Sequence, residues 1–247
     1  MPSSKDFRYF LIFVDDFSRM TWLYLLKERS EVSGVIELFY NDIKIQFSTF
    51  IRVFRTDNAL EYIKNNVPLF CSKNGIIHQT SYSHTSQQNG VVKRKHRHIL
   101  YVARTMMIHI HVPKYLWVDA VLSAYHLINR MPSSILHGKI PFSCLYPGKS
   151  IFSVPPRVFC CTCFVQDLSP GLDKLSPRSI KWYSRTQKGY QCYNPSIRKY
   201  FVSANVTFFN QFPTFLHKVQ LLHQSLFLYR LFFCLHLLSM MSLFQCH

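Results

Sequence analysis

The chain has 247 residues, of which 48% are hydrophobic, and this composition excludes an intrinsically disordered protein. Its 29 Lys and Arg residues against 12 Asp and Glu residues give a net charge of +17, which favours a polyanionic partner, nucleic acid before an acidic membrane. The eight cysteines lack the paired spacing of a zinc framework, and we interpret them as mostly reduced intracellular thiols. Because only three acids follow Glu61, a site that needs several carboxylates must draw mainly on the first quarter of the chain.

The first elements predict a mixed sheet with a helix on its face. Two aromatic and β-branched runs, residues 9–14 and 21–26, are separated by the polar turn "DDFSRM" and indicate a hairpin. Apolar residues then follow helical spacing from Ser30 onward, and "IRVFR" (51–55) indicates another strand. The helical positions are Val32, Ile36, Phe39 and Ile43.

Two longer helices are predicted in the middle of the chain. After a short helical stretch (61–74) and a strand-like run (75–80), Asn89 is placed to cap a helix that begins near Gly90. Apolar and cationic residues form separate stripes on that helix. The apolar stripe is Val92, Ile99, Ala103 and Met106, and the cationic stripe is Lys93, Arg97 and Arg104. A further helix, with a broad apolar face, is bracketed by Pro113 and Pro132.

The remainder of the chain changes character twice. Residues 133–157 are loop-like, and short strand candidates separated by turn signals follow them, which predicts a small β-barrel of about 60 residues. We expect one domain over 1–150, a second over 156–212 and an apolar tail over 213–247. The favoured interpretation of the tail is a non-native extension; a membrane-surface helix and a docking helix remain alternatives. Its longest uncharged apolar stretch is shorter than the ~20 residues of a membrane span.

Asp57 directly follows a predicted strand, where open sheets commonly place reactive groups, although a lone aspartate there is more often a turn former. Its surroundings decide the interpretation. The stretches "FRTDNALEY", "GIIHQTSYSHTSQQNGVVKRK" and "VPKYLWVDAVLSAYHLINRMP" resemble the integrase of Copia-type retrotransposons, and the resemblance covers about residues 7–212. It implies a ribonuclease-H-like α/β core and then an SH3-like barrel. It also implies DNA cutting and joining by two Mg²⁺ ions held by an Asp, Asp, Glu set.

Carried over residue by residue, the resemblance supplies one of the three acids. Asp57 matches the second acid and is the expected metal ligand, but the Glu position, in a segment like "QQNGVAER", is Lys93. The strand that bears the first Asp falls before Met1, so we expect the first strand to be missing and the chain to be truncated. Asp15 and Asp16 are expected to shape the hairpin turn, and Asp119 matches a non-catalytic acid. The sequence therefore predicts a degenerate, catalytically silent copy in which Mg²⁺ binding is doubtful.

The basic helix has two interpretations. It is either a solvated charged face or, as in the resembling family, a surface that lies against DNA. The expected nucleic-acid-binding residues are Gln87, Gln88, Asn89, Lys93, Arg94, Lys95, Arg97 and Arg104. A DNA-binding remnant without catalysis and a translated relic that barely folds are the alternatives to an integrase-like protein. The resemblance allows a homo-oligomer, disfavours a membrane partner, and implies an intracellular location that is nuclear for a functional protein.

Overall fold

The computed structural model describes residues 2–63, 66–81, 89–152, 159–165, 180–183, 190–194, 199–203 and 206–213. The chain divides into two compact units, residues 1–215 and 216–247, and the second lies outside the described residues. The prediction for the 213–247 tail therefore falls almost entirely outside them. Among the helices that the structure describes, none is both long enough and apolar enough to cross a membrane.

The predicted hairpin is confirmed, with strands β1 (Tyr9–Val14) and β2 (Thr21–Leu26) paired antiparallel. Its side chains alternate between two hydrophobic cores, as the period of a strand requires. Phe13 belongs to the core that contains helix α1, whereas its neighbour Ile12 belongs to the core that contains helices α4 and α5. The hairpin is therefore buried on both faces, which explains why its two strands are almost continuously apolar.

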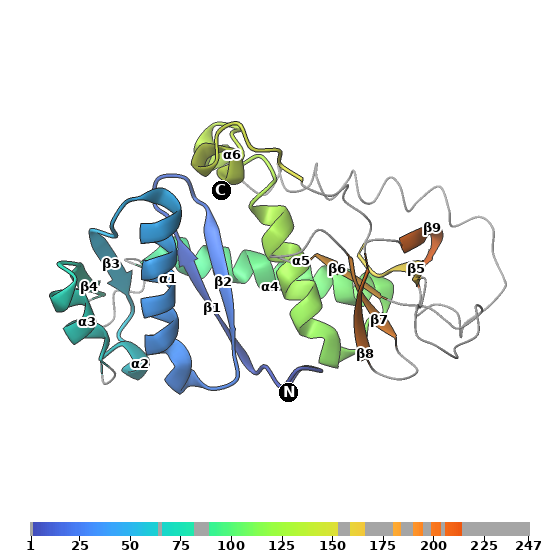
Figure 1. Ribbon diagram of the computed structural model, residues 1–247, viewed down its shortest axis with the longest axis horizontal. Helices are drawn as coiled ribbons and strands as arrows, with labels where there is room; N and C mark the ends of the chain where they lie inside the picture. Colours follow the sequence, from blue (N-terminus) through green and yellow to red (C-terminus); the bar gives the residue numbers. More distant parts are fainter. Residues whose placement is uncertain are drawn as a thin grey trace. The chain divides into compact units, whose positions relative to one another are not determined.

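Helix α1 (Val32–Phe47) follows a short 3₁₀ turn (Arg29–Glu31) and covers one face of the hairpin, while α4 lies on the other (Figure 1). Phe39 of α1 stacks on Phe13, with ring centroids 4.1 Å apart. The predicted apolar positions Val32, Ile36 and Phe39 are buried, which confirms the helical spacing.

A second pair of strands, β3 (Val53–Thr56) and β4 (Ile77–Thr80), is parallel. The crossover between them contains the short helices α2 (Leu60–Ile63) and α3 (Val67–Lys73), which is consistent with the length that a parallel connection requires. Among the described strands, neither β3 nor β4 pairs with the hairpin, so the two pairs form separate two-stranded sheets.

Helix α4 (Gly90–Ile110) begins where the sequence predicted, and α5 (Trp117–Ile128) follows it through a 3₁₀ turn (Lys114–Leu116). The expectation that Asn89 caps α4 with its side chain is wrong: Asn89 occupies the N-cap position, but its side chain makes no capping bond. The apolar stripe of α4 packs against α5 and the hairpin through fully buried Ile99.

Asn129, directly after α5, ties that helix to the hairpin. Its side chain is fully buried; Oδ1 accepts the backbone N–H of Thr21 at 3.0 Å and Nδ2 donates to the carbonyl of Thr21 at 2.8 Å. One amide thus satisfies both backbone groups at the first residue of β2.

The loop-like prediction for 133–157 is only partly right, because a 3₁₀ turn (Ser134–Leu136) and a short helix α6 (Pro141–Leu145) lie within it. Pro141 at the first turn of α6 lacks an N–H that the helix could not have used there. Five strands follow. They are β5 (Cys161–Val165), β6 (Ile180–Tyr183), β7 (Tyr190–Asn194), β8 (Lys199–Ser203) and β9 (Val206–Pro213).

These strands form a β5–β9 pair and a β6–β7–β8 sheet, both antiparallel. Four of the five were predicted as strand candidates, and β6 was not. Cys160 has φ 56°, a left-handed conformation that favours glycine.

A buried carboxylate lies where α5 contacts β8. Asp119 accepts a hydrogen bond from the Tyr200 hydroxyl at 2.9 Å, and burial raises the Asp119 pKa to about 6 despite that bond and nearby Lys5. Because the single Tyr200 proton goes to Asp119, the Ser4 hydroxyl, 2.7 Å away, is the donor to Tyr200. This short chain of hydrogen bonds connects α5, β8 and the N-terminal segment.

Candidate functional site

A cleft of about 1050 Å³ lies between the hairpin and the parallel pair. Its walls are strands β1 and β3, with residues of α1 on one side and of the first turns of α4 on the other. Asp57 and Lys93 both line this cleft, so the structure brings together the two positions that the sequence identified as the second acid and the replaced Glu.

Asp57 follows β3 directly and is half-buried, with Oδ1 accepting the backbone N–H of Ala59 at 3.3 Å. The preceding residue, Thr56, is buried and its hydroxyl lies 2.9 Å from Nε2 of His78 on β4. Burial, followed by the charges of Asp57 and Glu61, raises the Tyr62 pKa to about 12, so this phenol stays neutral at physiological pH. The carboxylate of Asp57 therefore lies at a fixed strand end, beside a neutral phenol and in a cleft that Lys93 also lines.

Lys93, in the first turn of α4, is exposed. Within the described part of the chain no ion pair shorter than 4.0 Å joins it to Asp57. The described residues also contain no group of three His, Cys, Asp or Glu side chains that could hold a metal ion.

The other two acids of the cleft are occupied by the hairpin turn, as predicted. Oδ2 of Asp15 accepts the backbone N–H of Ser18 at 2.7 Å and the Ser18 hydroxyl at 2.6 Å. Asp16 forms an ion pair with Arg19 at 2.7 Å, and Arg19 has φ 56°. Both carboxylates thus stabilise a tight turn.

The basic face of α4 is only partly formed by the residues that the sequence selected. Lys93, Arg94 and Arg97 are exposed within the first two turns. Lys95 is half-buried, and burial, followed by the charge of Arg19, lowers its pKa to about 8. Lys95 is therefore less accessible to a ligand than the exposed side chains of Lys93, Arg94 and Arg97.

The other four predicted residues are distributed differently. Arg104 lies away from the cleft, in a second groove of about 1060 Å³ that Lys114 also lines. Asn89 lines the first cleft and is nearly buried, which leaves it little surface for a base or sugar. Gln87 and Gln88 lie outside the described residues.

Sequence reasoning missed two contributors to the cleft. His96 stacks on Phe10 of β1, with ring centroids 4.6 Å apart and planes 10° from parallel, and burial lowers its pKa. Arg55 reaches across to Gln79 on β4, with Nη2 to Oε1 at 3.1 Å. The alternation of side chains along β3 could have predicted Arg55 at the cleft. The contact of His96 depends on how α4 crosses the hairpin, and the sequence around His96 does not predict it.

Comparison with known proteins identifies the family. The family model "Integrase core domain" matches residues 1–86, and the model "Retroviral polymerase SH3-like domain" matches residues 161–220. The chain is 37% identical over 210 residues to the Retrovirus-related Pol polyprotein from transposon RE1 of Arabidopsis thaliana. This chain belongs to the Pol polyprotein family of Copia-type retrotransposons.

The alignment with the RE1 Pol polyprotein covers 83% of the chain but 14% of the relative. A second Pol relative, from transposon TNT 1-94 of Nicotiana tabacum, is 32% identical over 205 residues, with 81% of the chain and 15% of the relative covered. The chain thus spans about one seventh of the length of these Pol polyproteins.

Among solved structures, the chain is similar to the HTLV-2 integrase catalytic core domain in complex with magnesium. The TM-score is 0.41 at 19% identity, covering 53% of this chain and 80% of that one. The two family matches, together with the mixed α/β arrangement, confirm the predicted fold class of a ribonuclease-H-like integrase core followed by an SH3-like domain. The boundaries proposed for the domains stay predictions.

Proposed function

We propose that this Pol segment binds nucleic acid through the exposed basic face of α4 and does not itself cut or join DNA. Its family role is DNA integration, supported by the integrase-core match and the Pol relatives. The observation that carries the proposal is that Asp57 and Lys93 line one cleft: the strand-end carboxylate shares it with a cation at the position that matches the family's Glu.

A divalent ion does not fit the donor set at this end of the cleft. Mg²⁺ takes oxygen ligands, and a site for two such ions needs several carboxylates. Asp57 supplies one, Asp15 and Asp16 are already engaged in the turn, and the Lys93 ammonium repels a cation. Without a metal-binding set, the geometry offers no means to stabilise the attacking and leaving oxygens of a phosphodiester exchange.

The catalytic half of the proposal is tested with the purified full chain and oligonucleotides that carry retrotransposon ends, in Mg²⁺ and in Mn²⁺. We expect no strand-transfer product above the background of a Asp57→Asn control. Product that depends on Asp57 would show that the chain assembles a metal site, and the inactivity proposal would then be wrong.

The binding half rests on the charge and position of the α4 face. Lys93, Arg94 and Arg97 are exposed within two turns of the helix start, and no acidic residue occupies the first turn. The N-terminal end of a helix carries a partial positive charge, which adds to the three cations and favours a phosphate. Such contacts need charge and reach, so they do not depend on the catalytic acids.

Binding is tested by fluorescence anisotropy with a labelled duplex over a range of salt concentrations. Each lost phosphate contact lowers the salt slope by about 0.9, so substituting Gln for Lys93, Arg94 and Arg97 should reduce it by about 2 to 3. The matched control substitutes Gln for three exposed cations outside α4, and it should leave the slope closer to the parent value. These are Lys27, Lys44 and Lys73. Equal losses in both variants would mean that only net charge matters, and the assignment to α4 would fail.

A further inference from the structure

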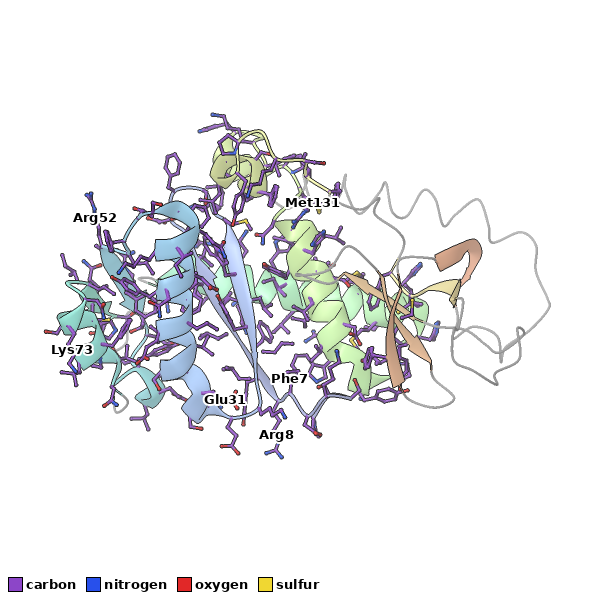
Figure 2. All side chains as sticks on the ribbon, viewed as in Figure 1. Phe7, Arg8, Glu31, Arg52, Lys73 and Met131 are labelled. Atoms are coloured by element: carbon purple, nitrogen blue, oxygen red, sulfur yellow. The ribbon has the colours of Figure 1, made fainter. Side chains whose placement is uncertain are left out.

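The second groove, of about 1060 Å³, lies along α4 from His96 onward, where the start of β1 and the first turns of α5 meet that helix. Its cationic rim consists of Arg8, which precedes β1, Arg104 of α4 and Lys114 of the 3₁₀ turn before α5. Figure 2 shows Arg8 projecting outward from the chain. None of the described residues that line the groove is acidic, so the groove attracts an anionic ligand.

The cations of this rim are available to a ligand. All three side chains are exposed, and no salt bridge within the described ranges joins any of them to a carboxylate. They belong to three elements that are brought together by the crossing of α4 over the hairpin. An anion in the groove would therefore meet positive charge from several sides without displacing an acid of the protein.

The floor of the groove is aromatic. His96 stacks on Phe10 with ring centroids 4.6 Å apart, and the Phe10 ring lies 6.4 Å from that of Trp117, with planes 41° apart. These three residues, here called the aromatic floor, all line the groove and are all partly exposed. Leu100 and Met107 of α4 line it beside them. A flat, weakly polar group of a ligand can therefore pack against this surface.

The cations of α4 connect this groove to the first cleft. Arg97 lines the first cleft and Arg104 lines the second groove. Seven residues are nearly two helical turns, so the two positions lie on the same side of α4, about 10.5 Å apart along its axis. A flexible chain of phosphates can contact both cations at once, and the basic face of α4 and the second groove then form one continuous surface.

The combination of a cationic rim and an aromatic floor favours one class of ligand. An acidic peptide would match the rim, but an aromatic floor gives it no particular advantage over another apolar surface. A nucleic-acid duplex brings phosphates, but the faces of its bases are stacked on one another and cannot contact the floor. A single strand presents phosphates and free base faces together, which is the combination that proteins bind with basic grooves and aromatic side chains.

We propose that the second groove binds unpaired nucleotides of a single-stranded nucleic acid, with a base stacked on the aromatic floor and phosphates held by the cationic rim. The inference rests on the proposed nucleic-acid binding and adds a second form of nucleic acid and a second contact surface to it. The groove volume is at the upper limit of about 300–1,000 Å³ for small-molecule pockets, so it accommodates a nucleotide.

The first test separates stacking from charge. The full chain is titrated into labelled oligothymidine of about 12 nucleotides, and into an abasic strand of the same length, which keeps the phosphates and lacks the bases. We expect the oligothymidine to bind at least about fivefold tighter, because one stacked base accounts for such a difference. Equal binding of the two strands would overturn the proposal.

Variants test the floor and the rim separately. Trp117→Leu keeps an apolar side chain against the core and should weaken oligothymidine binding at least about fivefold, while binding of a duplex should change less than about twofold. Arg104→Gln combined with Lys114→Gln should lower the salt slope for oligothymidine by about 1.4, at about 0.7 for each lost contact. The matched control is Lys73→Gln with Lys139→Gln, two exposed cations that line neither cavity, and it should keep the parent slope.

Photochemical cross-linking locates the base directly. A strand that carries 5-iodouracil forms a covalent bond on irradiation with an aromatic ring on which the base is stacked. Mass spectrometry should then find the cross-link on a residue of the aromatic floor. Cross-links confined to other residues would overturn the proposal. If Trp117→Leu does not fold, this measurement and the abasic comparison decide.

The outcomes also distinguish this inference from the proposed function. Equal binding of the oligothymidine and abasic strands, together with a reduced duplex slope in the variant of Lys93, Arg94 and Arg97, would overturn the inference and leave the proposed function standing. If neither duplex nor single strand binds, both are wrong. If polyglutamate of equal charge displaces the labelled oligothymidine as readily as the unlabelled strand does, the groove takes acidic polypeptides and the inference is wrong.

Discussion

The buried carboxylate of Asp119 makes a quantitative prediction about the pH dependence of stability. Burial raises its pKa from 3.8 to about 6 in the folded protein. At 1.36 kcal/mol per pKa unit, a difference of roughly 2 units corresponds to about 3 kcal/mol. Because the folded pKa is raised, the folded state binds the extra proton between about pH 4 and 6, and this contribution to stability is fully present below pH 4 and lost as the pH rises through 6.

The perturbation is Asp119→Asn, which keeps an oxygen for the Tyr200 hydroxyl but cannot titrate. The amide adds an N–H group where Oδ1 has no hydrogen-bond partner among the described residues, so the variant carries a constant offset in stability. The informative quantity is therefore the difference in unfolding free energy between variant and parent. It should change by about 3 kcal/mol in favour of the variant between pH 4 and pH 7.

Urea denaturation of the full chain, followed by tryptophan fluorescence at several pH values, gives this difference directly. The matched control is Asp6→Asn, an identical change at an exposed acid, for which the difference should stay within about 0.5 kcal/mol. A difference for Asp119→Asn that stays constant with pH would refute the reasoning, because it would mean that the carboxylate is as well solvated in the folded state as in the unfolded one.

Three other substitutions test the packing and the charge of the cleft. Asn129→Ala should destabilise the fold by about 2 to 4 kcal/mol in urea, since it strands two buried backbone groups, whereas exposed Asn41→Ala should cost little. Ile99→Ala should cost about 2 to 5 kcal/mol in the same assay, and a smaller loss would indicate that the core collapses into the cavity. Lys93→Glu should tighten Mn²⁺ binding at least about tenfold by electron paramagnetic resonance, because it replaces a cation with an acid in the cleft that Asp57 lines. Lys73→Glu, on α3, should not.

Local patterns were sufficient to predict most elements of the core. The hairpin, α1 and α4 are each specified by a periodic run of apolar residues that ends at a turn, and these periods depend only on the geometry of a strand or a helix. The short helix α6 was missed, because five residues carry too little periodicity to be distinguished from a loop, and strand β6 was not predicted either.

The candidate site was predictable in composition and not in arrangement. Asp57 and Lys93 were identified from their motifs, and they do share a cleft. The burial of Lys95 and of Asp119 could not be inferred, because each depends on what the neighbouring element presents: Arg19 of the hairpin turn in one case and Tyr200 of β8 in the other. Contacts of this kind are set by tertiary packing and leave no trace in local sequence.

The hydrogen bonds between Asn129 and Thr21 join residues that are 108 positions apart. Pairings of this separation raise the contact order of a domain and slow its folding, because the intervening loop must close before the contact is rewarded. During synthesis, the first residue of β2 leaves the ribosome more than a hundred residues before its amide partner does. Until α5 has been translated, the face of the hairpin that packs against this helix therefore stays exposed to solvent or to a chaperone.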